Sequence, residues 1–278
     1  MWNQVKTVLL LGLMSGLVLA VGFFFGGKTG LIFALVLSVL MNFGMFFWSH
    51  KLVLAMYRAR PALKSEYPHI HRLVEEISRK VGLPKPALYI IPTETPNAFA
   101  TGPSPKKAVV ACTDGILKLL DDNELKGVLA HEMSHIKNRD MLVSTIAATM
   151  AAVISTVARI AMFSGVSGDR DRGVHPLALL LLVIVTPIAA LLIQLAISRS
   201  REYLADESAA RTVRDSRGLA SALSKLESGC KANPLRMGNP TTSSLFIVNP
   251  FTAKGLVSLF STHPSTELRI ARLNKIKF

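Results

Sequence analysis

Four long apolar segments constrain the fold of this chain more than any other feature of its sequence. They cover residues 7–25, 31–48, 141–163 and 176–197. The first two carry no charged side chain, and each comes close to the roughly 20 apolar residues that a helix needs to cross a bilayer. The third is rich in alanine and contains Arg159, so it could also be a buried or partly inserted helix. We expect a multi-span membrane protein with four spans.

The first two segments are predicted to pair as a helical hairpin. Gly26, Gly27 and Gly30 separate them, and glycine is the residue that best tolerates a sharp turn. The sequence GGKTG does not resemble a signal-peptide cleavage site, and a second apolar segment follows at once. We therefore expect both segments to stay in the protein as membrane helices.

The distribution of lysine and arginine predicts the orientation in the membrane. Basic side chains follow the second apolar segment, precede the third and follow the fourth, whereas the first turn holds Lys28 alone. Loops rich in these residues stay in the cytoplasm. The chain then divides into a membrane hairpin (1–48), a first cytoplasmic part (49–140), a second hydrophobic hairpin (141–197) and a second cytoplasmic part (198–278).

The formal net charge of +14 agrees with a position beside anionic lipid. We expect no nucleic-acid partner, because the basic residues are not interleaved with aromatic residues as they are in single-strand binders. The two cysteines, Cys112 and Cys230, form no C-x-x-C pair. They are expected to be free thiols in a reducing compartment.

The cytoplasmic parts combine helix and strand patterns. Residues 67–81 have helical periodicity, whereas 87–93 and 108–112 are short runs rich in β-branched residues. Residues 97–102, NAFATG, could add a third, irregular strand. The predicted fold class is therefore α+β, mainly helical, with a small β-sheet.

Two further helices are predicted before the third apolar segment. One begins in TDGILKLL, with Thr113 or Asp114 as its N-cap. The other covers DDNELKGVLAHEMSHIKN, with Asp122 or Asn123 as its N-cap. Aspartate, asparagine and threonine are all residues that cap helices well.

The second of these helices contains the motif HExxH. Residues four apart share one helix face, so His131 and His135 can direct two imidazoles at one metal ion. Glu132 lies about 100° around the helix from the first histidine. From there it can act as a general base on a water without being a ligand itself. This pattern is typical of zinc metallopeptidases.

A catalytic zinc ion usually has three protein ligands. Met141 occupies the position at which a metzincin would place its third histidine, so the third ligand must come from another helix. Glu202 and Asp206 are four apart in SRSREYLADESAARTV and share a face if this segment is helical. Glu202 could bind the metal while Asp206 accepts a hydrogen bond from a ligand histidine. On spacing alone, Glu207 is the rival of Glu202.

Several motifs, taken together and in order, resemble a known family. PNAFATG, LAHEMSHIKNRD, SRSREYLADESAA and THPSTELRI closely resemble the HtpX-type membrane zinc metalloproteases, relatives of the CAAX prenyl proteases and of the Oma-type proteases. The resemblance covers almost the whole chain. It implies a gluzincin-like site with one Zn²⁺ bound by His131, His135 and Glu202, and with Glu132 as the base. It also implies an endopeptidase of the bacterial inner membrane, with its catalytic domain facing the cytoplasm, that degrades misfolded or damaged membrane proteins.

Two weaker signals concern the substrate. Asn97, Ala98 and Phe99 could form an edge strand that pairs with an extended polypeptide, or they could belong to a plain loop. His263 could donate a hydrogen bond to a developing oxyanion, or it could be a capping or core residue. The resemblance favours a substrate-binding strand at 97–99.

Two other classes of protein compete with a peptidase. The first is an inactive membrane scaffold or adaptor that keeps zinc for its structure, but such a protein has no need of Glu132. The second is a transporter, which would carry its ionisable residues within the apolar segments. Here the ionisable candidate residues lie outside these segments, whose only clear charge is Arg159. The sequence therefore favours a zinc endopeptidase that acts on polypeptides beside a lipid bilayer.

Overall fold

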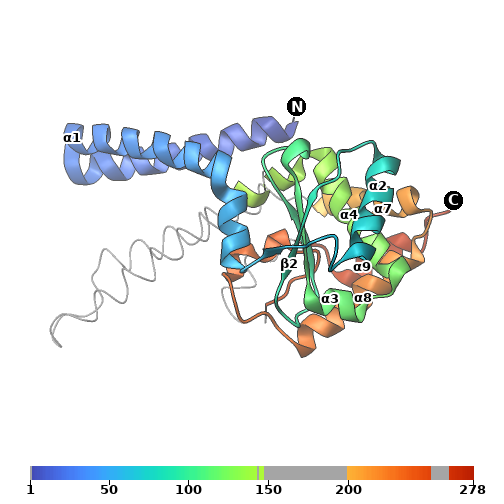
Figure 1. The fold of residues 1–278 in the computed structure, drawn as a ribbon. Coiled ribbons are helices and arrows are strands. Elements are labelled where there is room, and N and C mark those ends of the chain that lie inside the picture. Colours follow the sequence, from blue (N-terminus) through green and yellow to red (C-terminus); the bar gives the residue numbers. More distant parts are fainter. Residues whose placement is uncertain (1, 143, 147–198, 252–262) are drawn as a thin grey trace, which may run out of the picture.

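The computed structural model describes residues 2–142, 144–146, 199–251 and 263–278. A helical hairpin projects from a rounded domain of helices and one small sheet (Figure 1). The predicted fold class, mainly helical with a small sheet, is confirmed. Most of the third and fourth apolar segments lies outside the described residues. The expected spans there, and the domain boundaries, stay predictions.

Helix α1, Trp2–Met56, forms the hairpin. Its backbone leaves helical geometry at Gly27, where φ is 53° and ψ is −136°, and a positive φ is easily adopted only by glycine. The two arms lie side by side (Figure 1), and the Asn42 side-chain amide donates to the Ser15 hydroxyl across them at 2.7 Å. The predicted glycine turn is therefore confirmed.

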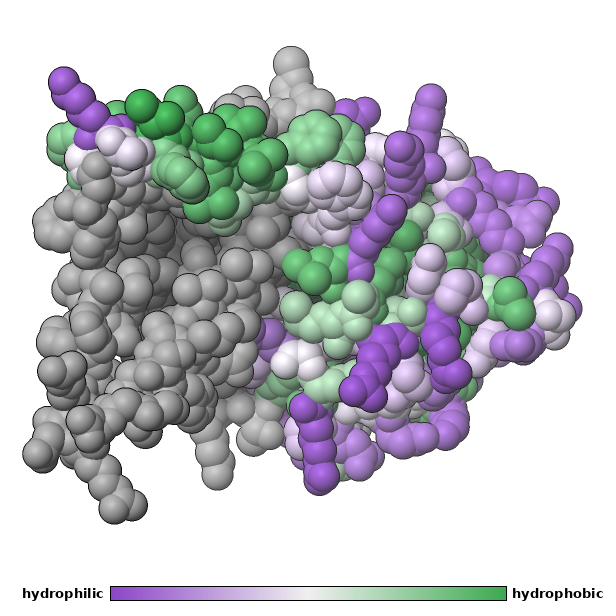
Figure 2. Space-filling model, turned by 60° about the vertical axis from the view of Figure 1, so that its left-hand side comes forward, coloured by the Kyte–Doolittle hydropathy of each residue, from purple (hydrophilic) through white to green (hydrophobic). Residues whose placement is uncertain are grey.

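Helix α1 carries an exposed apolar surface. Its window Gly27–Gly44 has a mean hydropathy of 1.5, and 11% of this window is buried. Among the described residues, α1 is the one helix that is long and apolar enough to cross a membrane. Ile32, Phe33 and Leu40 are 65%, 79% and 65% exposed, and Figure 2 shows a hydrophobic patch over this part of the molecule. A contiguous patch of this kind marks an interaction surface.

The sheet has four strands in the order β1-β2-β4-β3. Strands β2 (Ala87–Ile91) and β4 (Val109–Thr113) are parallel, and the short β1 (Arg60–Pro61) pairs with β2 in antiparallel register. Strand β3 (Ala98–Thr101) is antiparallel to β4, with Ala98 opposite Cys112. The possible third strand is thus a regular edge strand, and the two predicted strands are confirmed.

Six α-helices of the described residues make up the rest of the domain: α2 (Pro68–Val81), α3 (Asp114–Leu119), α4 (Asp122–Asn138), α7 (Arg199–Val213), α8 (Arg217–Ala232) and α9 (Thr266–Leu273). Two 3-10 helices, η1 (Pro105–Lys107) and η2 (Pro240–Leu245), lie in connecting segments. The predicted helices over 67–81 and 121–138 are confirmed within one residue at each end.

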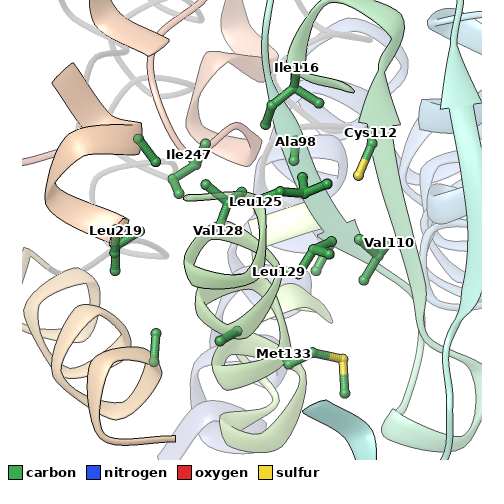
Figure 3. Close-up of a cluster of buried hydrophobic side chains, with 14 of the residues drawn as sticks. Ala98, Val110, Cys112, Ile116, Leu125, Val128, Leu129, Met133, Leu219 and Ile247 are labelled. Atoms are coloured by element: carbon green, nitrogen blue, oxygen red, sulfur yellow. The ribbon is translucent and has the colours of Figure 1, made fainter. Parts of the chain in front are cut away.

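Helix α4 forms the centre of the main core. Figure 3 shows Leu129 and Met133 directed from α4 toward Val110 of β4, whereas Val128 faces the side of Leu219 on α8. All of these side chains are fully buried. Since a buried leucine or methionine stabilises a fold by about 2–5 kcal/mol relative to alanine, the position of α4 is firmly fixed. This rigid helix carries the HExxH motif.

A second buried cluster joins the end of α1 to the edge of the sheet. Tyr57, directly after α1, packs with Phe99 of β3 and with Phe246, and the three ring centroids are 5.1–6.0 Å apart. Val53 and Leu54 of α1 belong to the same cluster. Such tilted and edge-to-face aromatic pairs add about 0.5–1.5 kcal/mol each to the burial of the rings.

The N-cap of α3 is Thr113, as predicted, but the prediction for α4 is wrong. Its N-cap is Asp121, whose carboxylate accepts from the backbone N–H groups of Asn123 and Glu124, and not Asp122 or Asn123. The Glu124 side chain in turn accepts from the Asp121 N–H. This capping box requires a glutamate three residues after the cap, and only Asp121 has one at that distance.

Replacing Asp121 by alanine is expected to lower the free energy of unfolding by about 1 kcal/mol, the usual contribution of an N-cap. The matched control is Asp122→Ala. The Asp122 side chain is 76% exposed and pairs only with the partly exposed His69, so its loss should cost less. Thermal unfolding of the two variants checks this order. An equal or larger loss for Asp122→Ala contradicts the assignment of the cap.

Candidate metal centre

Helices α4 and α7 bring the three expected ligands together. His131 and His135 lie one turn apart on α4, and Glu202 lies in the first turn of α7. The two histidine Nε2 atoms are 3.1 Å apart. Glu202 carboxylate oxygens lie 3.5 Å from Nε2 of His135 and 3.7 Å from Nε2 of His131. A tetrahedral zinc ion with bonds of about 2.0–2.2 Å holds its ligand atoms about 3.3–3.6 Å apart, so these residues could hold one.

Two carboxylates determine which imidazole nitrogen faces this centre. His131 Nδ1 lies 2.9 Å from Asp206, and His135 Nδ1 lies 3.2 Å from Asp140. Because a carboxylate accepts hydrogen bonds, both Nδ1 atoms carry the donated proton. The two Nε2 lone pairs then face each other across 3.1 Å. They repel unless a proton or a metal ion lies between them.

The buried charges also favour a divalent cation. Four carboxylates surround the histidines, each at most 5% exposed: Glu132, Asp140, Glu202 and Asp206. Two guanidinium groups oppose them, since Arg201 pairs with Asp140 at 3.3 Å and Arg269 pairs with Asp206 at 2.7 Å. With both histidines neutral, as metal ligands are, these described residues have two more negative than positive charges, which are costly to bury. One carboxylate oxygen of Glu202 is also buried without a hydrogen-bond partner. The donor set therefore fits Zn²⁺ in charge and in geometry.

Glu132 is held beside the ligands by the edge strand. It is 2% exposed, and its carboxylate accepts a hydrogen bond from the backbone N–H of Ala100 in β3. Burial raises the pKa of Glu132 to about 7. A carboxylate with a pKa near the working pH is well suited to accept a proton and to return it.

Burial and the neighbouring charges shift the pKa values of the ligands in opposite directions. Burial lowers the pKa of His131 to about 4, which keeps this imidazole neutral. Burial also lowers the pKa of His135, but Glu202 and Asp140 outweigh it and raise the pKa to about 9. For Glu202 burial raises the pKa, and the surrounding positive groups outweigh it and lower the pKa to about 2. Without metal, a proton on His135 therefore separates the two histidines.

The proton on His135 predicts how zinc affinity depends on pH. Its pKa in the folded, metal-free protein is raised to about 9, so the proton is bound below that pH and must leave before zinc binds. The apparent affinity is expected to rise about tenfold per pH unit from pH 7 toward pH 9, and then to level off. Competition with a chelator of known affinity, repeated across this range, measures it. A zinc affinity that is constant between pH 7 and pH 9 contradicts the presence of a proton on His135 that zinc must displace.

A cavity opens at the centre between α4 and the segment that follows η2. It has about 350 Å³ of empty volume, counting the open space at its mouth, and is lined by the three ligands, Glu132 and nine of their neighbours, including Ala100, Phe246 and His263. Nε2 of His263 lies 3.5 Å from Glu202. The ligands and Glu132 therefore line a cavity that is open to its surroundings.

The other residues singled out in the sequence do not line this cavity. Asp206 occupies the expected place behind His131, whereas Glu207 is exposed and pairs with Arg211. Asn97 is buried, and its amide donates to the carbonyl of Val248. Phe99 belongs to the aromatic cluster that contains Tyr57 and Phe246. Of the edge strand, it is Ala100 that lines the cavity. Substrate contact by residues 97–99 stays a prediction.

The sequence analysis did not identify Ala100, Asp140 or Arg269. Asp140 follows the HExxH helix in the quoted motif, and its distance of five residues from His135 gives no helical signal. Arg269 is 138 residues from His131 and reaches it only through the packing of α9. Ala100 acts through its backbone, which no side-chain pattern reveals.

The profile of peptidase family M48 matches residues 64–277. The chain belongs to peptidase family M48. All three expected ligands, Glu132 and His263 lie within the matched range, and the prediction of a metallopeptidase is confirmed. M48 membership also disfavours the transporter.

Two similar proteins match this M48 peptidase over nearly their whole length. A "Protease HtpX homolog" from Pyrococcus furiosus is 50% identical over 276 residues, which are 98% of this chain and 95% of the relative. One from Persephonella marina is 51% identical over 277 residues, 98% of this chain and 96% of the relative. The predicted resemblance to HtpX-type proteases is confirmed. A solved structure, "Crystal Structure of S. mikatae Ste24p", is 18% identical with a TM-score of 0.48, and covers 98% of this chain and 65% of that chain.

Proposed function

We propose that this M48 peptidase is a membrane-embedded, zinc-dependent endopeptidase that cuts misfolded or damaged membrane proteins. The observation that carries the proposal is Glu132, buried beside the paired Nε2 atoms of His131 and His135 and oriented by the backbone of Ala100. A structural zinc site has no use for such a base. The arrangement instead suits hydrolysis of a peptide bond.

His131, His135 and Glu202 would hold the zinc ion, and Asp206 and Asp140 would keep the two imidazoles in the required tautomer. When bound, zinc supplies a Lewis acid that polarises the scissile carbonyl and makes a water more acidic. Glu132 accepts the proton of the attacking water and then passes it to the leaving amine. Burial raises the pKa of Glu132, and this makes its carboxylate a better proton acceptor than an exposed one.

His263 is the candidate that stabilises the oxyanion. It lines the cavity, and burial lowers its pKa, so the ring is neutral and can still donate one N–H. An extended substrate would lie along the free edge of β3, where strand addition supplies backbone hydrogen bonds. The carbonyl of Ala98 already accepts from the N–H of Ile247, and the N–H of Ala100 donates to Glu132. The carbonyl of Ala100 is therefore the group proposed to pair with a substrate.

The exposed apolar surface of the hairpin supports a location of enzyme and substrates at a membrane. Its exposed apolar surface (Figure 2) would lie in lipid, and Trp48, 53% exposed at the end of the second apolar segment, is typical of a membrane interface. We place the chain in the inner (plasma) membrane with its catalytic part in the cytoplasm. Substrates would then be cytoplasmic segments of membrane proteins.

Proteoliposomes that contain the enzyme and one membrane-protein substrate test this proposal. The substrate is used in its folded form and as a variant whose cytoplasmic domain is destabilised. The destabilised form should be cut faster by at least an order of magnitude, because an extended segment is needed for strand addition. Removal of zinc with a chelator should stop the cleavage, and added zinc should restore it. Equal cleavage of both forms contradicts quality control, and cleavage that resists the chelator contradicts the metal mechanism.

A further inference from the structure

The most deeply buried large cation of the described residues is Arg269, which is 2% exposed. It lies on α9, and its guanidinium reaches α7. Its Nε donates to one oxygen of Asp206 at 2.8 Å, and its Nη2 donates to the other oxygen at 2.7 Å. This two-point contact matches the planar guanidinium to the planar carboxylate. It prevents the carboxylate from rotating.

The orientation of Asp206 matters because the same carboxylate faces a metal ligand. The oxygen that accepts from Nη2 of Arg269 lies 2.9 Å from Nδ1 of His131. Nη2 and this Nδ1 are 3.5 Å apart, but both are donors and both point at the shared oxygen. Arg269 thus holds the Asp206 carboxylate in place. This carboxylate in turn determines the orientation and the tautomer of the His131 ring.

The third contact of the guanidinium is with Ile247, a residue that lines the cavity. Nη1 donates to the carbonyl of Ile247 at 2.8 Å, and the N–H of Ile247 donates to the carbonyl of Ala98 in β3 at 3.1 Å. Arg269 therefore connects the wall of the cavity with the carboxylate behind the ligand. Lysine offers no planar fork and could not make these contacts together.

We propose that Arg269 is a positioning residue of the metal centre. Through Asp206 it holds His131 in the tautomer and orientation that bind zinc. It touches neither substrate nor metal. The inference rests on the proposed function in one respect, namely that His131 is a zinc ligand.

The test measures the zinc dissociation constant of the detergent-solubilised full chain by competition with a chelator. The variants are Arg269→Gln, Arg269→Lys and Asp206→Asn, together with the double variant Arg269→Gln/Asp206→Asn. The matched control is Arg272→Gln. Arg272 lies on the same helix and also contacts α7, but by stacking on the ring of Tyr203 at 3.8 Å. Thermal unfolding is recorded for every variant with and without zinc.

Arg269→Gln should weaken zinc binding 10–100-fold, as is usual when the partner of a ligand histidine is disturbed. Arg269→Lys should recover part of this loss, and Arg272→Gln should bind like wild type. The double variant should bind zinc no more than about threefold more weakly than the single variant with the lower affinity, since Arg269 acts on His131 through Asp206. If Arg269→Gln does not fold, Arg269→Lys and Asp206→Asn carry the comparison.

Wild-type zinc affinity in a folded Arg269 variant overturns the inference, even if the variant unfolds at a lower temperature. A double variant whose losses are fully additive overturns it as well. If the wild type binds no zinc at all, the proposed function fails, and this inference fails with it. The two failures are therefore distinguishable.

Discussion

Glu132→Gln is expected to reduce kcat/KM for peptide hydrolysis by at least about 10²–10⁴-fold, the usual contribution of a general base. The amide has nearly the same shape and can still accept from the Ala100 N–H. It cannot take a proton from water. The bound zinc should stay near one ion per chain, because Glu132 is not among the three grouped ligands. Cleavage of an unfolded substrate such as casein, with zinc measured on the same sample, checks both quantities.

Ser134→Ala is the matched control for Glu132→Gln. Ser134 is also buried on α4, and its hydroxyl donates to the carbonyl of Ala130 within the helix. Its loss should leave activity within a factor of a few. If Glu132→Gln keeps more than a tenth of the wild-type activity, the role of base is wrong. If wild type and variant both bind zinc and neither cuts any polypeptide, the scaffold hypothesis gains support.

Glu202→Gln is expected to weaken zinc binding by more than about 100-fold, beyond the loss usual for a residue behind a ligand. Glutamine removes a negative charge from a buried cluster in which that charge opposes the cation. Activity at low free zinc should fall in parallel. Chelator competition and casein cleavage in zinc-buffered solution measure the two effects.

Glu207→Gln is the matched control, because Glu207 lies on the same helix and was the alternative ligand on spacing alone. Its carboxylate is half-exposed and pairs with Arg211, a contact that contributes about 0.3–0.5 kcal/mol. Zinc binding should therefore not change. Loss of zinc in Glu207→Gln, with wild-type binding in Glu202→Gln, would reverse the assignment of the third ligand.

Local periodicity allowed much of this fold and site to be predicted. The spacing of four residues placed His131 and His135 on one face of a helix, and the same spacing placed Glu202 and Asp206 on one face of another. Gly27 was predicted to turn the hairpin because of its backbone freedom. Each of these predictions depends on residues within a few turns of one another.

The remaining features depend on contacts between distant parts of the chain. Arg269 meets Asp206 across 63 residues, and neither residue has a local pattern that reveals the other. The N-cap of α4 was missed for a different reason. Asp121, Asp122 and Asn123 are adjacent and can all cap a helix, so the choice depends on which of them has the reciprocal contact with Glu124.

The aromatic cluster at the end of α1 has a mechanical consequence. Apart from Gly27, α1 has no break up to Met56, and Tyr57 then packs directly on Phe99 and Phe246. Phe99 precedes Ala100, whose backbone N–H donates to the proposed base Glu132, and Phe246 lines the cavity. Helix α1 is thus packed rigidly against the domain and is not joined to it by a flexible linker. Under the proposed function, with α1 in the bilayer, the cleft is held at a fixed position beside the membrane, and this position suits substrates that are themselves bound to the membrane.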